Sequence, residues 1–186
     1  MQSLARDAED ARSEVSEAMG YSVNHVIDTD VEGLWRLFFD VELARAMLKA
    51  FGNVGSFEIL EETTDAQGRR HRRIECRSNV ELPGFITKLV GDGSYTEVGC
   101  FDPSIKRYSA QCVPKRGADK FSTSFEITAR PLENGSRCER QITTENKIKV
   151  FGIGSMLEGL LERAQRDAHN QSANFINDWI RTRTSS

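Results

Sequence analysis

This sequence lacks long hydrophobic runs and an excess of charge of either sign. No apolar stretch approaches the roughly 20 residues that a membrane-spanning helix needs, and the N-terminus lacks the basic and then apolar segments of a signal peptide. With 25 Lys+Arg against 28 Asp+Glu and a formal net charge of -3, the 186-residue chain has no overall field that attracts nucleic acid or anionic membranes. We therefore expect a cytoplasmic protein without a nucleic-acid partner, in which any membrane contact is local.

The common metal, redox and catalytic motifs are also missing. The chain contains no glycine-rich phosphate loop, no G-x-S-x-G turn and no H-E-x-x-H helix, and its three histidines fall in three different predicted elements. The cysteines occur singly in strand-like segments, without paired spacing: Cys76, Cys100, Cys112 and Cys138. We expect reduced, buried thiols, no metal and no cofactor.

The longest pattern that is present runs from Gly154 to Arg183. Apolar residues recur there at steps of three and four, with charged residues between them: Leu157, Leu160, Leu161, Ala164, Ala168, Phe175, Ile176 and Trp179. This spacing predicts one long amphipathic helix. Such a helix is longer than is usual in globular proteins, so a broad surface must cover its apolar side.

The N-terminal part divides into a weakly apolar segment and the start of a domain. Residues 1–19 place mostly small apolar residues at helical spacing, which predicts an amphipathic or partly disordered segment; residues 20–186 form a single domain. Alternation from Tyr21 to Ile27 predicts a strand with His25 on the apolar side. A T-x-x-E capping box at Thr29 begins one short helix, and a second runs from its cap Asp40 to Gly52.

Six further strands are predicted between the short helices and the long one. Alternating segments separated by turn-forming residues predict an antiparallel meander over 54–63, 70–80, 94–101, 106–113, 120–130 and 137–150. An apolar insert bracketed by proline and glycine, Leu82 to Gly91, interrupts the series. The basic run from Arg69 to Arg73 falls at the first hairpin and alternates faces, which favours a solvated strand end over a nucleic-acid site.

These elements predict an α+β fold in which a curved, seven-stranded antiparallel sheet wraps round the long C-terminal helix, with two short helices after strand one. The order over Tyr21 to Arg183 resembles that of the START-like, helix-grip (SRPBCC-type) superfamily, which includes birch-pollen-allergen-type and steroidogenic lipid-transfer domains. Within it, the chain resembles a bacterial family described as a domain of unknown function. Short motifs carry this second likeness: residues 21–25 (YSVNH), 34–38 (LWRLF), the insert beginning at 82–85 (LPGF) and residues 151–154 (FGIG).

The resemblance implies an apolar cavity between sheet and helix that binds a hydrophobic small molecule, such as a lipid, sterol or isoprenoid. It does not imply one reaction, because the same fold hosts carriers, cyclases, aromatases and receptors. We expect the cavity to be lined by inward-facing strand residues, the insert and the long helix: His25, Ser78, Phe85, Ile86, Leu89, Phe121, Thr123, Phe125, Arg140, Thr144, Asn146, Leu157, Leu161, Ala164 and Ala168.

Two alternatives stay open at this point. The favoured function is an intracellular lipid carrier or sensor, and the alternative is a cyclase- or aromatase-type enzyme on a polyketide-like substrate, with His25 transferring a proton and Arg140 or Asn146 polarising a carbonyl. Each polar residue also has a purely structural interpretation, as a hydrogen-bonded core or rim residue.

The apolar loops have two interpretations as well. Phe85, Ile86, Phe151 and Ile153 either form a lid that makes transient membrane contact or plug one end of the core. The sequence does not determine the oligomeric state.

Overall fold

The computed structural model describes residues 19–52, 54–79 and 84–184. The predicted N-terminal segment therefore lies outside the described residues except for Met19, as do Leu82 and Pro83 of the insert. The described elements follow one another as β1 (Met19–Ile27), α1 (Val31–Phe38), α2 (Val41–Phe51), β2 (Val54–Thr64), β3 (Arg70–Ser78), α3 (Gly84–Val90), β4 (Tyr95–Asp102), β5 (Arg107–Pro114), β6 (Phe121–Leu132), the 3-10 turn η1 (Glu133–Gly135), β7 (Arg137–Ile148) and α4 (Gly154–Thr184).

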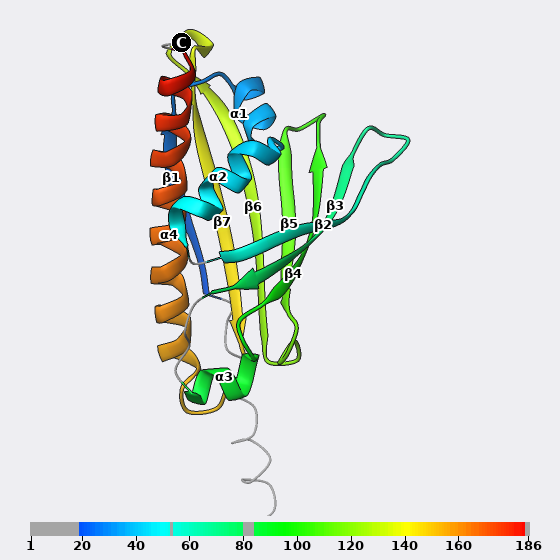
Figure 1. Cartoon of the computed structure of the whole chain (residues 1–186), viewed down its shortest axis with the longest axis vertical. Helices are drawn as coiled ribbons and strands as arrows, with labels where there is room; N and C mark the ends of the chain where they lie inside the picture. Colours follow the sequence, from blue (N-terminus) through cyan, green and yellow to red (C-terminus); the bar gives the residue numbers. More distant parts are fainter. Residues whose placement is uncertain (1–18, 53, 80–83, 185–186) are drawn as a thin grey trace, which may run out of the picture.

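The seven strands form one antiparallel sheet in the order β1-β7-β6-β5-β4-β3-β2. Strands β2 to β7 are the predicted meander, and β1 pairs with β7 rather than with β2. The first and second strands therefore lie at opposite edges, and the chain between them carries α1 and α2 across the concave face (Figure 1). In the same view α4 runs beside β1 and β7, and α3 lies at the lower end of the sheet. The predicted α+β helix-grip fold is confirmed.

The caps of the two short helices match the expected residue types, with one shift in position. Asp40 accepts hydrogen bonds from the backbone amides of Glu42 and Leu43 at 2.8 and 3.2 Å, and Gly52 ends α2 at φ 67°. The predicted cap Thr29 of α1 is wrong by one residue, because the side chain of Asp30 accepts from the amide of Gly33. Both residue types cap helices well, so sequence alone does not choose between neighbours.

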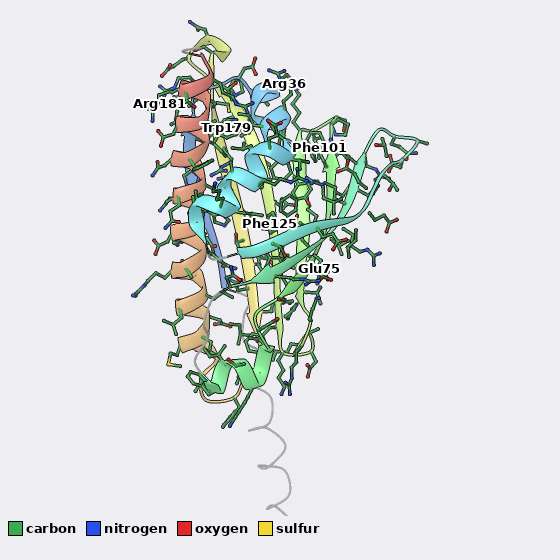
Figure 2. All side chains as sticks on the ribbon, viewed as in Figure 1. Arg36, Glu75, Phe101, Phe125, Trp179 and Arg181 are labelled. Carbon is green, nitrogen blue, oxygen red and sulfur yellow. The ribbon has the colours of Figure 1, made fainter. Side chains whose placement is uncertain are left out.

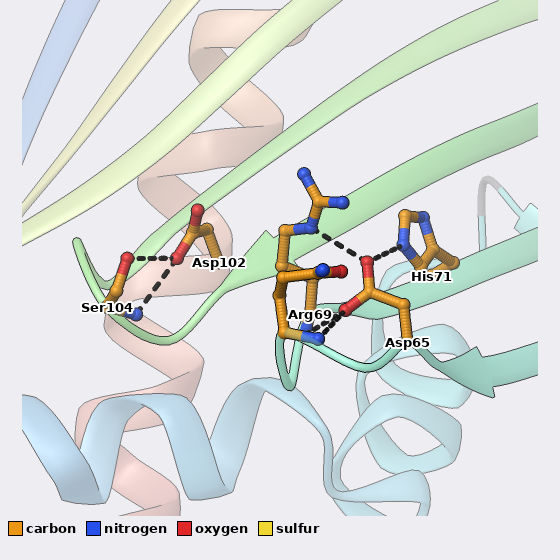
Figure 3. A network of polar contacts seen from close by, with 6 residues as sticks. Asp65, Arg69, His71, Asp102 and Ser104 are labelled. Carbon is orange, nitrogen blue, oxygen red and sulfur yellow. Dashed lines mark hydrogen bonds and ion pairs between the residues drawn. The ribbon is translucent and has the colours of Figure 1, made fainter.

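The hairpin of β2 and β3 holds the basic run against acidic partners (Figure 3). One Asp65 oxygen accepts from the backbone amides of Gln67 and Arg69, and the other accepts from Arg69 Nε at 2.7 Å and lies 3.0 Å from His71 Nε2. The contacts with His71 and Arg69 hold the pKa of Asp65 well below its usual value. The other arginines of the run also face carboxylates: Arg70 and Arg72 face Glu62, and Arg73 faces Glu61.

Two apolar clusters fill the upper part of the molecule. The first joins α1, α2 and α4 to β1 and β7, and Phe175 and Trp179 pack against it; Phe175 lies 5.7 Å from Phe51 of α2 between ring centroids. The second lies between α1 and the middle strands and is rich in aromatic rings. Its buried residues are Trp35, Tyr108, Ala110, Ile127 and Ile142, and the partly buried Phe38, Phe101 and Phe125 pack against them. The upper end of the concave face is therefore packed.

No helix of the described residues is long and apolar enough to cross a membrane. The four cysteines are free thiols; Cys76 and Cys138 are buried, and Cys100 and Cys112 are half-buried.

We expect Asp40→Ala to lower the free energy of unfolding by about 1 kcal/mol, because the amides of Glu42 and Leu43 lose their acceptor. Urea denaturation of the two proteins measures the difference. Asp40→Asn is the matched control, since an asparagine oxygen also caps helices, and it should retain most of the stability. Equal losses in both variants would contradict the capping role.

Candidate functional site

The C-terminal helix is anchored to one edge of the sheet. Asn177 accepts a hydrogen bond from the backbone amide of Asp28 at 2.9 Å and donates one to the carbonyl of Val26 at 3.0 Å, while Gln165 accepts from the hydroxyl of Tyr21 at 3.0 Å. Within the described residues α4 packs on β1, β7 and α2. The concave face of β3 to β6 thus lies beside α4, bordered by α2 above and α3 below (Figure 1).

Side chains on this part of the concave face are enclosed by protein yet keep accessible surface. Tyr95, Glu97, Cys112 and Phe121 are all half-buried although they project to the inner side of the sheet. Burial raises the pKa values of Tyr95, Glu97 and Cys112, as expected for groups removed from bulk water. These half-buried side chains mark the inner surface of β3 to β6 beside α4, which we call the hollow. Phe125 of β6 packs against the aromatic cluster at one end of this surface, and Figure 2 labels it over the middle strands of the sheet.

One side of α4 borders the hollow. Helical spacing places Leu157, Leu161, Ala164 and Ala168 on the side of α4 that also carries Phe175. Leu157 is buried, Leu161 and Ala168 are half-buried, and Ala164 is exposed. Because Phe175 packs on Phe51 of α2, this side of α4 faces the concave face.

The lower end of the hollow is bordered by apolar loops. Phe85 on α3 is 48% exposed, and Ile86 and Leu89 are half-buried; Phe151 before α4 is 93% exposed, and Ile153 is half-buried. Gly117 in the β5–β6 loop has a φ of 77°, and a Cβ at this position would lie 2.5 Å from the carbonyl oxygen of Leu89. The glycine therefore lets α3 lie directly against that loop. The described part of the predicted insert thus contains a short helix, α3, at one end of the sheet (Figure 1).

His25 and Arg140, which the sequence placed on inner faces of two strands, contact one another. One Nη of Arg140 lies 3.2 Å from His25 Nδ1, and His25 Nε2 lies 3.0 Å from Asn170 Oδ1. The same arginine nitrogen also donates to the backbone carbonyl of His169 and to Ser172 Oγ. Both imidazole nitrogens therefore have protein partners, and the group ties α4 to the sheet rather than presenting His25 to a substrate.

Burial dominates the electrostatics of this group. It lowers the pKa of Arg140 to about 10 and the pKa of His169 to about 4, and it also lowers the pKa of His25. Arg140 has no carboxylate partner among the described residues, and its positive charge further lowers the pKa of both histidines. We therefore expect both rings to be neutral at pH 7.

Asn146 and Thr123 belong to a second internal network. The hydroxyl of Thr123 donates to Asn146 Oδ1 at 2.7 Å, and the amides of Asn146 and Gln165 exchange hydrogen bonds at 2.8 and 3.2 Å. Thr144 lies opposite Tyr21 in the β1–β7 pairing and is 2% exposed. These contacts favour the structural interpretation for Asn146. The backbone of Ser78 ends β3, and its side chain is outside the described residues.

Sequence reasoning missed a polar pair on the concave face. The hydroxyl of Tyr108 on β5 donates to Glu97 Oε1 on β4 at 2.6 Å. Gly99 makes this possible, because a Cβ there would lie 1.9 Å from the Tyr108 hydroxyl oxygen. Glu97 shares the inner face of β4 with Tyr95, Gly99 and Phe101. The sequence signal for this site is Glu97 itself, a carboxylate among the otherwise uncharged alternating residues of this strand face.

An open depression lies beside the hollow, between α2 and the start of β2. Its volume is about 480 Å³, and Phe57 is one of its walls, opposite Cys76 in the β2–β3 pairing. Its full lining is Arg45, Leu48, Lys49, Gly52, Gly55, Ser56, Phe57 and Asn79. Among the described residues, no three His, Cys, Asp or Glu side chains are placed to hold a metal ion.

A family model described as "Protein of unknown function (DUF2505)" matches residues 22–180. The chain belongs to this family. No curated protein matches its sequence.

Several solved structures share the fold of this DUF2505 protein, and one of them is a START superfamily protein. A START superfamily protein from Mycobacterium smegmatis is 13% identical, with a TM-score of 0.60 over 88% of this chain and 99% of that chain. TTHA0849 from Thermus thermophilus is 15% identical, with a TM-score of 0.62 over 86% and 95%. Norcoclaurine synthase from Thalictrum flavum is 15% identical, with a TM-score of 0.58 over 88% and 87%. At these identities the likeness establishes the fold alone.

We expect acid to destabilise the protein partly through His169. Its pKa is about 4 when folded, whereas an unfolded histidine titrates near 6.5, so the unfolded chain binds the proton first as the pH falls. Stability due to this neutral ring is complete above about pH 6.5 and is lost as the pH falls towards 4. The slope from one such group is at most about 1.4 kcal/mol per pH unit.

Urea denaturation between pH 7 and 4.5 measures this dependence. His169→Gln keeps the backbone carbonyl that Arg140 binds and removes the titrating ring, so its stability should fall less steeply over this range. Parallel profiles for the two proteins would show that His169 does not contribute.

Proposed function

We propose that this protein binds a hydrophobic small molecule, such as a lipid, sterol or isoprenoid, in the hollow between β3–β6 and α4, and that it is an intracellular carrier or sensor. The observation that carries the proposal is the lateral position of α4. Because the helix is anchored on β1 and β7, apolar residues of β6 such as Phe121 and Phe125 keep accessible surface inside the fold. Mostly apolar concave surfaces with few polar groups are typical of small-molecule sites.

The solved structures with this fold support a ligand-binding role. Norcoclaurine synthase is also known in complex with dopamine and hydroxybenzaldehyde, and that complex has a TM-score of 0.59 with 14% identity. A di-domain ARO/CYC protein, BexL, from the BE-7585A biosynthetic pathway has a TM-score of 0.60 with 12% identity over 46% of its chain. Proteins with this fold therefore bind small molecules and include enzymes. The choice between carrier and enzyme depends on this chain's own residues.

Those residues favour the carrier. An enzyme of the kind considered above needs His25 and Arg140 or Asn146 to face a substrate with unused hydrogen-bonding capacity. Instead both nitrogens of His25 have partners, and the side-chain oxygen of Asn146 accepts from Thr123 and Gln165.

We further propose that the lower end of the molecule makes transient contact with membranes. Large apolar side chains are exposed there on α3 and at the start of α4: Phe85, Phe151 and Met156. Exposed basic residues lie on α3, in the adjacent β5–β6 loop and before α4, which suits a surface of anionic lipid: Lys88, Arg116, Lys120 and Lys149. A ligand that enters or leaves beside α3 would thereby avoid crossing bulk water.

Leu161→Trp should weaken ligand binding about tenfold or more, because a larger ring on this side of α4 occupies the hollow. Titration with N-phenyl-1-naphthylamine, an uncharged fluorophore that brightens in apolar sites, measures the affinity. Leu160→Trp is the matched control, since Leu160 is 52% exposed on the same helix, and its affinity should match that of the original chain.

Urea denaturation separates binding from folding in these variants. An equal loss of stability and of binding in Leu161→Trp would mean that α4 only closes a core. A chain that never binds the fluorophore would overturn the proposed function.

The double variant Phe85→Ser, Phe151→Ser should bind vesicles of phosphatidylcholine and phosphatidylglycerol about tenfold or more weakly, because each ring loses apolar surface to insert. Co-sedimentation with the vesicles measures this. The control Ile105→Ser removes an apolar side chain that is 54% exposed in the β4–β5 turn, at the other end of the sheet, and should have no effect. Equal losses of vesicle binding in the double variant and in Ile105→Ser would contradict membrane contact through the lower end.

A further inference from the structure

We infer that the ligand is an amphiphile whose polar end is a neutral hydroxyl group, and that Glu97 and Tyr108 receive this hydroxyl inside the hollow. The inference rests on the proposed function and names the class of molecule that the site selects.

The pair is built from neighbouring strands and held in one arrangement. Tyr108 is fully buried, and its hydroxyl donates to Glu97 Oε1 at 2.6 Å across the position that Gly99 leaves free. On β3, the buried side chain of Arg72 lies with its Nε 3.0 Å from Glu62 Oε2, and its charge also acts on Glu97. Among the described residues, Glu97 is the one carboxylate on the inner face of β4 to β6.

Glu97 keeps acceptor capacity that the protein does not use. Among the described residues, Tyr108 is its one hydrogen-bond donor, whereas a carboxylate offers about four lone-pair sites. Glu97 also remains half-buried rather than fully covered, so its free oxygen can be reached from the hollow. A buried carboxylate with an unfilled acceptor site is unfavourable until a donor fills it, and a ligand hydroxyl is such a donor.

The charges around Glu97 select a neutral group. A carboxylate ligand such as a fatty acid would face Glu97 at close range in poorly hydrated surroundings, where like charges repel strongly. A cationic amine would instead approach the buried guanidinium of Arg72. A hydroxyl donates to Glu97 without adding charge.

The register of the sheet leads the apolar tail away from this pair towards α4. Glu97 lies opposite Cys112, Cys112 opposite Thr123, and Thr123 opposite Asn146. The row spans three strand spacings, roughly 14 Å, which is the length of a medium-chain alkyl group. Phe121 and Phe125 flank this row on β6, so the tail would lie over their rings.

Competition between matched amphiphiles tests the inference. Decan-1-ol and decanoate share one chain length and differ in the polar end; each displaces N-phenyl-1-naphthylamine from the full chain at pH 7.5. We expect decan-1-ol to bind at least about tenfold more tightly to the original chain. Glu97→Gln removes the charge with little change in size, so the preference should fall to about twofold or less, chiefly through tighter decanoate binding.

Two further variants keep the result decisive. Tyr108→Phe removes only the phenol oxygen and should reduce the preference for the alcohol several-fold, which provides a second readout if Glu97→Gln does not fold. Glu145→Gln changes an exposed carboxylate of β7 and should leave the preference unchanged. The inference is overturned if the original chain binds decan-1-ol and decanoate with equal affinity, or if Glu97→Gln and Tyr108→Phe both keep the preference for decan-1-ol. In either case, fluorophore binding still supports the proposed function. If the fluorophore does not bind at all, both fail.

Discussion

The buried hydrogen bonds that hold α4 against β1 and β7 decide the rest of the structure. Arg140 and Asn146 project from β7 and bond to α4 through His169, Ser172 and Gln165. Hydrogen bonds are directional, and a buried polar group left without a partner is unfavourable by about 1–3 kcal/mol. A helix held in this way cannot shift over the middle of the sheet to cover β3 to β6. The hollow is thus a consequence of where polar side chains place the helix.

The same rule explains which inner-face polar residues receive no partner from α4. Residues on β1 and β7 lie under α4, so the helix supplies their partners, as Asn170 does for His25. Glu97 lies on β4, beyond the reach of α4, and its donor comes from β5. Distance from α4 therefore separates polar groups that fasten the fold from one that faces the hollow.

Much of the fold follows from local patterns, whereas the site depends on contacts between distant segments. Alternation placed the strands and their inner faces, and three- and four-residue spacing placed α4, because these periods are properties of the backbone itself. Alternation also put His25 and Arg140 on inner faces correctly. Their partners could not be found this way, since His25 and Asn170 are 145 residues apart and meet only once the helix has its lateral position. The N-cap of α1 was missed by one residue because Thr29 and Asp30 are both good caps.

Gly99 and Glu97 each weaken the strand that contains them when considered alone. A glycine inside a strand removes side-chain packing and leaves more backbone entropy to be lost on folding, and a buried carboxylate resists ionisation, so burial raises the pKa of Glu97. The two residues act together, because the absence of a Cβ at Gly99 leaves the space in which the Tyr108 hydroxyl reaches Glu97. Packing alone would be better served by two apolar residues. Their joint presence on the part of the sheet that α4 leaves open supports the proposal that the hollow receives a polar group of its ligand.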